Sequence, residues 1–175
     1  MANKKQQSLF WENESLSLPQ KYARAISLFQ EYGPVLQQQA TISPLLTSLI
    51  QETSDLAQYM EKQQLGLICT MCAGKPGGSC CSMFMGNNTD ILQLISNMLI
   101  GCMPTMHETD ADSCPYLGPC GCEFKVKPIF CLNYNCLHIA HHLGNSRLEE
   151  LTCASGKVLQ IQLRLEEELL KHLSS

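Results

Sequence analysis

The stretch Cys69-Thr-Met-Cys72-Ala-Gly-Lys-Pro-Gly-Gly-Ser-Cys80-Cys81 dominates the sequence of this 175-residue chain. It opens with a CxxC turn, which sets two sulfur atoms on one side of a tight loop, close enough to share an ion at Zn–S distances near ~2.3 Å. Cys80 and Cys81 are adjacent, and neighbouring side chains tend to point apart. Three arrangements are therefore possible. Both thiols could bind one ion, which would require a strained backbone, or each could bind a different ion. Alternatively, one thiol could be a ligand while the other packs in the core.

Cysteines are concentrated around this stretch. Of the eleven in the chain, all except Cys153 lie between Cys69 and Cys136. Residues 1–19 contain no apolar core region and no small-residue cleavage site, so we expect a cytoplasmic protein without a secretory signal. In a reducing compartment, clustered cysteines indicate a metal site more often than disulfides, and an odd total excludes complete internal pairing.

The bulk composition favours one globular domain over residues 1–175. The apolar fraction is 45%, and no apolar run reaches the ~18 to 20 residues of a membrane helix. The formal charge is −4, and no basic stripe with interleaved aromatic residues is present. We therefore expect neither a membrane nor a nucleic acid as a partner.

Residues 1–66 contain no cysteine and read as helical. Apolar residues at helical spacing predict a helix that begins at Pro19 and is ended or kinked by Pro34. Ser43 followed by Pro44 is a good helix start, with a capping side chain and a proline in the first turn. From there apolar residues keep helical spacing as far as Gly66.

Residues 67–136 form the cysteine-cluster region, which is rich in glycine and proline and reads as mostly irregular. One helix is expected within it, capped by Asn88 or Thr89 and ending before Gly101. Such a region has few of the backbone hydrogen bonds that hold helices and sheets together, so we expect bound metal to hold it in place.

Residues 137–175 are again predicted to be helical. A short helix should run from Leu137 to Leu143, ended by Gly144, and Gly156 should divide the remainder in two. The expected fold class is therefore mainly α, with helices at both ends that enclose a loop-rich, cysteine-ligated metal-binding centre.

Four further motifs follow the opening stretch in a fixed order. They are Cys114-Pro115-Tyr116-Leu117, Cys122-Glu-Phe124, Lys127-Pro128 and Cys131-Leu-Asn-Tyr134-Asn-Cys136. With the CxxC element and the Cys-Cys pair, they make the chain resemble the YkgJ-like family, whose domains are described as cysteine clusters that chelate zinc or iron. The resemblance covers residues 69–136. The chain departs from the family pattern in a longer loop between Cys72 and Cys80 and in a lysine at 127, where arginine is usual.

The resemblance implies a set of metal ligands, which match the family positions one by one. They are Cys69, Cys72, Cys80, Cys81, Cys114, Cys122, Cys131 and Cys136. The family is described mainly by metal binding, so the resemblance implies a site more than an activity. Some relatives attach this domain to flagellin lysine methylation, which implies an enzymatic alternative.

The remaining cysteines and the histidines have simpler interpretations. Cys102 and Cys153 are expected to be thiols that bind no metal, and Cys153 is expected to pack in the core. For Cys120, a role as a metal ligand and a role as a spare thiol are equally favoured. His138 and His142 would share one helix face, as a metal-binding pair would, but we interpret them as exposed, because the thiols alone suffice.

From these residues we expect a cytoplasmic protein that holds zinc or iron through cysteine thiolates. Eight thiolates satisfy two separate four-coordinate ions, or one iron–sulfur cluster with ligands to spare. A first alternative is an iron–sulfur redox or protein-methylation-related enzyme. A second alternative is a thiol-redox sensor, in which Cys80 and Cys81 or Cys120 and Cys122 cycle between thiol and disulfide.

Overall fold

The computed structural model of the chain describes residues 14–73, 80–108 and 112–173, and it is mainly helical, as expected. The predicted loop from Gly74 to Ser79 lies outside the described residues. In chain order the elements are α2 (Leu18–Gln38), α3 (Ser43–Lys62), α4 (Leu65–Ala73), α5 (Met83–Asn87), α6 (Ile91–Leu99), β1 (Leu117–Gly118), β2 (Gly121–Cys122), α7 (Ile129–Asn133) and α8 (Leu137–Leu173).

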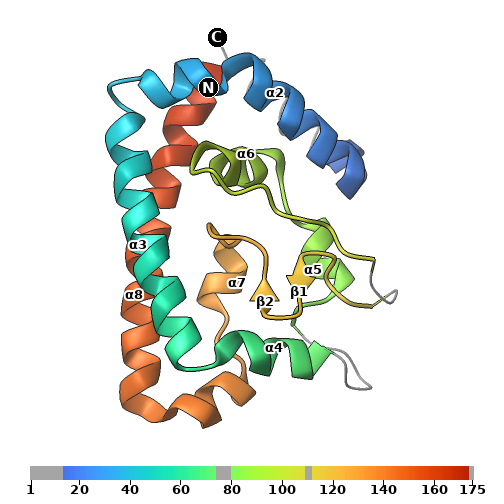
Figure 1. Ribbon diagram of the computed structural model, residues 1–175, viewed down its shortest axis with the longest axis vertical. Coiled ribbons are helices and arrows are strands. Elements are labelled where there is room, and N and C mark those ends of the chain that lie inside the picture. Colours follow the sequence, from blue (N-terminus) through green and yellow to red (C-terminus); the bar gives the residue numbers. More distant parts are fainter. Residues whose placement is uncertain (1–13, 74–79, 109–111, 174–175) are drawn as a thin grey trace.

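Two long helices, α3 and α8, lie side by side and form one wall of the molecule (Figure 1). The chain turns from α3 into α4 at one end of this wall, while α2 and α6 pack together at the other end. Between these ends lie α5, α7 and a two-stranded antiparallel hairpin of β1 and β2. The cysteine region is thus bounded by helices from both ends of the chain.

The kink of α8 confirms one predicted boundary and contradicts another. Gly144 has φ 69° and ψ 177°, a non-helical conformation open to glycine, so the first helical segment ends at Leu143 as expected. The predicted break at Gly156 is wrong, because the helix continues through it. A single helical glycine costs only about 1 kcal/mol, and burial of the apolar side chains of Leu151 and Val158 on either side offsets that cost.

The helix α2 shows that Pro34 does not end the helix, which was one of its two expected effects. The helix runs past this proline to Gln38. Leu36 is buried beyond the proline, and the Gln37 side-chain amide donates to the Leu99 carbonyl of α6 at 2.9 Å. Packing of α2 against α6 therefore extends the helix across a residue that disfavours it.

The junction of α3 and α4 departs from the prediction in two ways. The helix α3 begins at Ser43 as expected, but the capping position is occupied by Ile42, and no side-chain hydrogen bond caps the helix. A turn at Gln64, with φ 56°, then separates α3 from α4. The helical zone does not end at Gly66, because α4 begins at the buried Leu65 and carries the CxxC element. The two cysteines of that element therefore lie on a helix and not in a tight loop.

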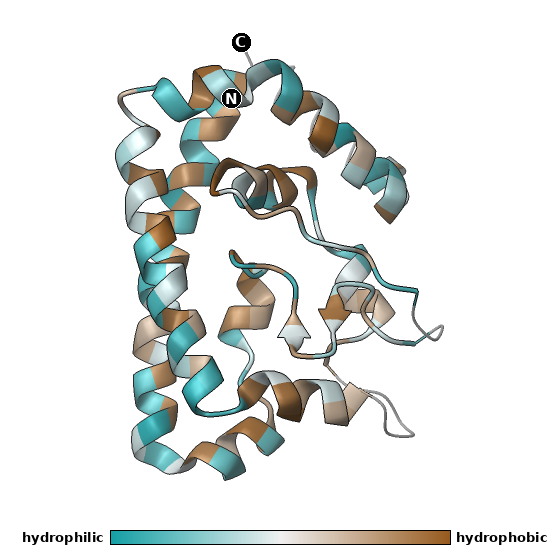
Figure 2. Ribbon diagram, viewed as in Figure 1, coloured by the Kyte–Doolittle hydropathy of each residue, from teal (hydrophilic) through white to brown (hydrophobic). Residues whose placement is uncertain are grey.

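The helix α6 is the most buried element of the fold, and it lies where the sequence predicted a helix. Figure 2 shows it as one of the most hydrophobic segments, whereas α3 and α8 alternate between polar and apolar residues. Its cap is Asp90, whose carboxylate accepts from the Gln93 backbone N–H at 2.7 Å, so the expected cap at Asn88 or Thr89 is wrong.

A buried polar network fixes the irregular segment that follows β2. The Asn97 side-chain oxygen accepts from the backbone N–H groups of Lys125 and Val126 at 3.1 and 3.0 Å. Its amide nitrogen donates to the Val126 and Gln93 carbonyls, both at 2.9 Å. The Gln162 amide of α8 in turn donates to the Gln93 side chain at 2.8 Å. Part of the breaker-rich region is thus held by hydrogen bonds between protein groups.

Among the described ranges, no helix has both the length and the apolar character that crossing a membrane requires.

Candidate functional site

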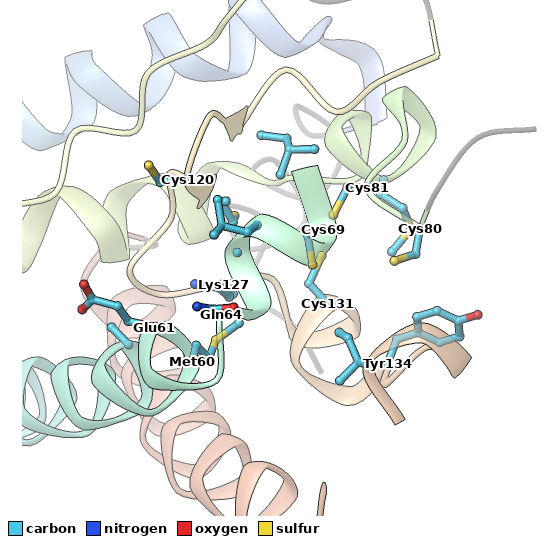
Figure 3. A pocket seen from close by; sticks show the side chains of 18 residues that line it. Met60, Glu61, Gln64, Cys69, Cys80, Cys81, Cys120, Lys127, Cys131 and Tyr134 are labelled. Carbon is cyan, nitrogen blue, oxygen red and sulfur yellow. The ribbon is translucent and has the colours of Figure 1, made fainter. Parts of the chain in front are cut away.

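Two cavities lie among the cysteines, and they share part of their walls. The larger, which we call the outer cavity, has a volume of about 460 Å³ and lies between α4, the hairpin and α7 (Figure 3). The smaller, which we call the inner cavity, measures about 30 Å³ and is lined by the buried Tyr116 and Phe124. Three thiols line both cavities: Cys81, Cys122 and Cys131.

The cysteines reach these cavities from separate elements. Cys69 is on α4, Cys122 ends β2, and Cys131 is on α7. Cys81 lies just before α5, and its carbonyl accepts from the Cys114 backbone N–H at 2.9 Å. That bond fixes two chain-distant segments side by side, so both thiols face the inner cavity.

A close backbone approach places α4 over the hairpin. Any side chain at Gly66 would overlap the Cys120 carbonyl, and a side chain at Gly121 would meet the Gly66 Cα at 2.8 Å. Gly121 also has φ 113°, a conformation that favours glycine. The Thr70 hydroxyl, one turn along α4, donates to the Gly118 carbonyl at 3.1 Å. These two glycines therefore bring the first thiol of the CxxC element toward β2.

The Cys-Cys pair makes hydrogen bonds that adjacency alone did not predict. The Cys81 thiol interacts with both the Cys69 and the Cys80 sulfur, and Cys80 also interacts with Cys136. In Figure 3, Cys69, Cys80, Cys81 and Cys131 gather on one side of the outer cavity, and Cys120 lies apart. The two adjacent side chains thus reach one common group of sulfurs.

These hydrogen bonds divide the thiols by acidity. Donation from Cys81 lowers the pKa of Cys80 to about 6, and it also lowers the pKa of Cys69. Cys81 itself, which shares its proton with both neighbours, has a raised pKa. A thiolate on Cys80 at neutral pH is therefore favoured, with Cys81 as its proton-bearing partner.

The deeper thiols have raised pKa values because burial disfavours their charged form. This holds for Cys114 and Cys122, and burial raises the pKa of Cys131 to about 12. The Lys127 ammonium, which donates to the Phe124 carbonyl at 3.1 Å, opposes this effect at Cys122 and Cys131. A metal cation bound in this cluster would lower these pKa values much more than Lys127 does, since a bound metal ion deprotonates a coordinating thiol outright.

The acidity of Cys80 leads to a prediction for the metal-free protein. Its folded pKa of about 6 lies below the ordinary thiol value, so Cys80 stays mostly thiolate as pH falls from 8 to 7. We expect its alkylation by iodoacetamide to slow by less than about twofold over that interval. Peptide mass spectrometry of chelator-treated protein measures this rate residue by residue.

The control for this prediction is the same cysteine in protein unfolded with urea. There the hydrogen bonds from Cys81 and Cys136 are lost, and an ordinary thiol loses close to tenfold in thiolate per pH unit below its pKa. A tenfold decrease at Cys80 in the folded protein as well would contradict the assigned acidity.

Seven of the eight predicted ligands take part in this arrangement. Six line one or both cavities, and Cys136 joins through its hydrogen bond with Cys80. The six are Cys69, Cys80, Cys81, Cys114, Cys122 and Cys131. Cys72, further along α4, lines neither cavity.

The other cysteines differ in their surroundings. Cys120 is exposed and lines the outer cavity only. Cys102 is half-buried against the core, with its sulfur 3.5 Å from the Glu123 carbonyl oxygen. Cys153 is exposed on α8, so its predicted place in the core is wrong.

The histidines lie outside the cavities. His138 and His142 are exposed on α8, as interpreted from the sequence, and His142 is 2.8 Å from the Gln63 carbonyl. A carbonyl oxygen can only accept, so the His142 ring nitrogen donates this hydrogen bond. The bond joins α8 to the turn between α3 and α4. Sequence reasoning gave no role to His107, whose ring nitrogen lies 2.9 Å from the Glu123 carboxylate beside β2.

Two buried hydroxyl groups of the inner cavity were also missed. Within the described part of the chain, the Tyr116 and Thr89 hydroxyls have no hydrogen-bond partner. Both residues line the inner cavity with four thiols. Because buried polar groups are nearly always satisfied, these orphaned atoms suggest that the cavity takes an additional polar or charged occupant. No sequence signal distinguishes them from ordinary core residues.

The donor set suits a soft or borderline cation, because thiolate sulfur is the preferred ligand of zinc and of iron–sulfur clusters. None of the eleven cysteines, all of which lie in the described ranges, forms a disulfide. Among the described residues, however, no three His, Cys, Asp or Glu side chains are arranged closely enough to hold a metal ion as they stand. The sulfurs would have to draw together around an ion. Comparison with family models, with curated proteins and with solved structures finds no match for this chain.

Proposed function

We propose that this chain is a cytoplasmic metal-binding protein that holds zinc or iron through cysteine thiolates. The observation that carries the proposal is the convergence of seven cysteines from distant segments of the chain: six line two adjoining cavities, and Cys136 is hydrogen-bonded to Cys80. Thiols spread over a core for packing alone would not meet at one place. The resemblance of residues 69–136 to the YkgJ-like family points in the same direction.

The inner cavity is the better candidate for the first ion. Four thiols line it, which is the number of ligands that a closed structural zinc site uses. They are Cys81, Cys114, Cys122 and Cys131. A second ion, or an iron–sulfur cluster, would take ligands from Cys69, Cys80 and Cys136 on the side of the outer cavity.

Charge balance supports a role for Lys127 in this centre. Four thiolates around one divalent ion carry a net charge of about −2. The Lys127 side chain lines the outer cavity and favours the ionised forms of Cys69, Cys122 and Cys131. When bound, the metal would supply folding free energy and, if iron, a site for electron transfer.

An iron–sulfur redox or protein-methylation-related enzyme is the second candidate, and the outer cavity favours it. A purely structural zinc site needs no space beside its ligands, whereas the outer cavity adjoins six thiols. A thiol–disulfide sensor is the third candidate. The hydrogen-bonded series of Cys69, Cys81 and Cys80, in which the pKa values of Cys69 and Cys80 are lowered, favours this interpretation.

One experiment separates the three candidates. Protein produced and purified without air is analysed for metal and acid-labile sulfide, and its absorption spectrum is recorded. Colourless protein with stoichiometric zinc supports the leading proposal in its zinc form. Iron with sulfide and a broad visible band supports a cluster and keeps the enzyme candidate open. Metal-free protein whose thiol count decreases on mild oxidation would contradict metal binding and favour the sensor.

A further inference from the structure

We propose that the outer cavity binds a small, uncharged, apolar organic molecule beside the cysteine centre. This inference rests on the proposed function, because it names the class of ligand that the same centre would meet. The sequence gave no indication of such a site, since its walls come from five separate parts of the chain.

The volume of the outer cavity is the first argument. At about 460 Å³ it lies within the range of roughly 300–1,000 Å³ that is typical of small-molecule sites. An ion held by sulfur at ~2.3 Å fills only a small fraction of that space. The inner cavity, at about 30 Å³, is closer to the scale of a single ion or water.

The walls are the second argument. Apart from the thiols, the outer cavity is lined mostly by apolar side chains of α3, α4, β1 and α8, among them Met60, Leu67, Leu117 and Ile139. Met85 of α5 is shared with the inner cavity. Methionine side chains adapt to irregular shapes, which suits a cavity that takes an apolar guest. An apolar molecule would gain roughly 25 cal/mol for each Å² that it buries there.

The charges around the cavity argue against an anionic ligand. Apart from the thiols, its charged side chains are Glu61 of α3 and Lys127, which oppose each other. The ammonium already donates to the Phe124 carbonyl and faces the thiols Cys122 and Cys131. A thiolate–metal centre adds further negative charge, so an anion entering the cavity would be repelled.

The mouth of the cavity is itself apolar. Leu67 and Tyr134 line the cavity and yet remain 49% and 56% exposed, so they lie where it opens to solvent. Figure 3 shows Tyr134 at the edge of the sulfur group, beyond Cys131. An apolar molecule in the opening would cover these two side chains and remove their apolar surface from water.

A pair of fluorescent dyes with the same aromatic skeleton tests this inference. Phenylnaphthylamine is uncharged, and anilinonaphthalene sulfonate carries one negative charge. We expect zinc-loaded full-length protein to bind the uncharged dye at least about tenfold more tightly than the sulfonate. Zinc is chosen because it does not absorb visible light, and the zinc content of each sample is measured before titration.

Two substitutions on α3 locate the bound dye. Ala57 lines the cavity, so Ala57→Trp should fill part of it and weaken binding of the uncharged dye by about tenfold or more. Gln58 is exposed and does not line the cavity, so Gln58→Trp should leave binding unchanged within about twofold. Leu67→Ser, at the mouth, should weaken binding by a few-fold without affecting the fold, because this side chain is half-exposed.

The outcomes separate this inference from the proposed function. Stoichiometric zinc without binding of either dye would overturn the ligand site and leave the metal proposal standing. Equal binding of both dyes, or binding that Ala57→Trp leaves unchanged, would also overturn it. Loss of zinc binding with preference for the uncharged dye intact would instead overturn the proposed metal centre.

Discussion

Replacing Cys81 with serine is expected to abolish most metal binding, the largest effect of any single substitution in this protein. Cys81 lines both cavities, and its thiol interacts with the sulfurs of Cys69 and Cys80. Its carbonyl also pairs with the segment that carries Cys114. A serine hydroxyl is a poor ligand for zinc or iron, so the centre would lose its most connected donor.

The expected magnitude follows from known metal sites. Loss of an outer-shell partner typically costs about 10–100-fold in metal affinity, and loss of a direct ligand should cost at least as much. Chelator competition measures the affinity, and circular dichroism monitors the fold. Because binding of a structural ion contributes to folding, Cys81→Ser should also lower the unfolding temperature of the metal-loaded protein.

Cys153→Ser is the matched control, since Cys153 is an exposed thiol on α8 outside both cavities. It should retain full metal content and the wild-type unfolding temperature. If Cys81→Ser binds metal as tightly as Cys153→Ser does, Cys81 is not a ligand, and the assignment of the centre to these cavities is wrong.

Asn97→Ala is expected to cause the largest loss of stability among substitutions outside the cysteines. The Asn97 side chain is fully buried and makes four hydrogen bonds, three of them to the segment of Lys125 and Val126. Alanine would leave two backbone N–H groups without a partner, whereas the Val126 carbonyl keeps its hydrogen bond from the Gln93 side chain. Each buried unsatisfied group costs about 1–3 kcal/mol. We expect the free energy of unfolding to decrease by about 3–4 kcal/mol, measured by urea denaturation of metal-free protein.

A control with the same side chain is available at Asn88, which is exposed and makes one side-chain hydrogen bond, to the Phe84 carbonyl at 2.8 Å. Asn88→Ala should lower the free energy of unfolding by no more than about 1 kcal/mol. Similar losses for the two variants would show that the buried network does not hold the segment after β2. Asn97→Ala should also weaken metal binding, because that segment joins Cys122 to Lys127.

The helical frame was largely predictable, because amphipathic spacing is a local property. The start of α3 at Ser43 and the position of α6 follow from apolar periodicity, although their expected caps were wrong, and the stop at Gly144 follows from a helix-ending glycine. The errors arose where tertiary contacts outweighed local preference. Pro34 and Gly156 did not end their helices, since packing against α6 and α3 stabilises the chain on both sides of each.

The candidate site was predictable only in its chemical components. The CxxC element was expected in a tight loop, yet it lies on α4, because burial of Leu65 and the contact of Gly66 with Gly121 favour a helix there. A short apolar run such as this one does not distinguish helix from loop by periodicity. The inner and outer cavities could not be predicted, because their walls are formed by residues far apart in the chain.

By itself the sequence determined the supply of thiols and the mainly helical class, both of which are properties of residue type and local spacing. Only the tertiary structure decided which thiols meet. Cys81 lies beside Cys69 and Cys114, while Cys72 is outside both cavities and Cys153 is exposed. The physical reason is that proximity between distant segments depends on long-range packing, here the glycine contact beneath α4 and the amide network around Asn97, and no local pattern encodes either.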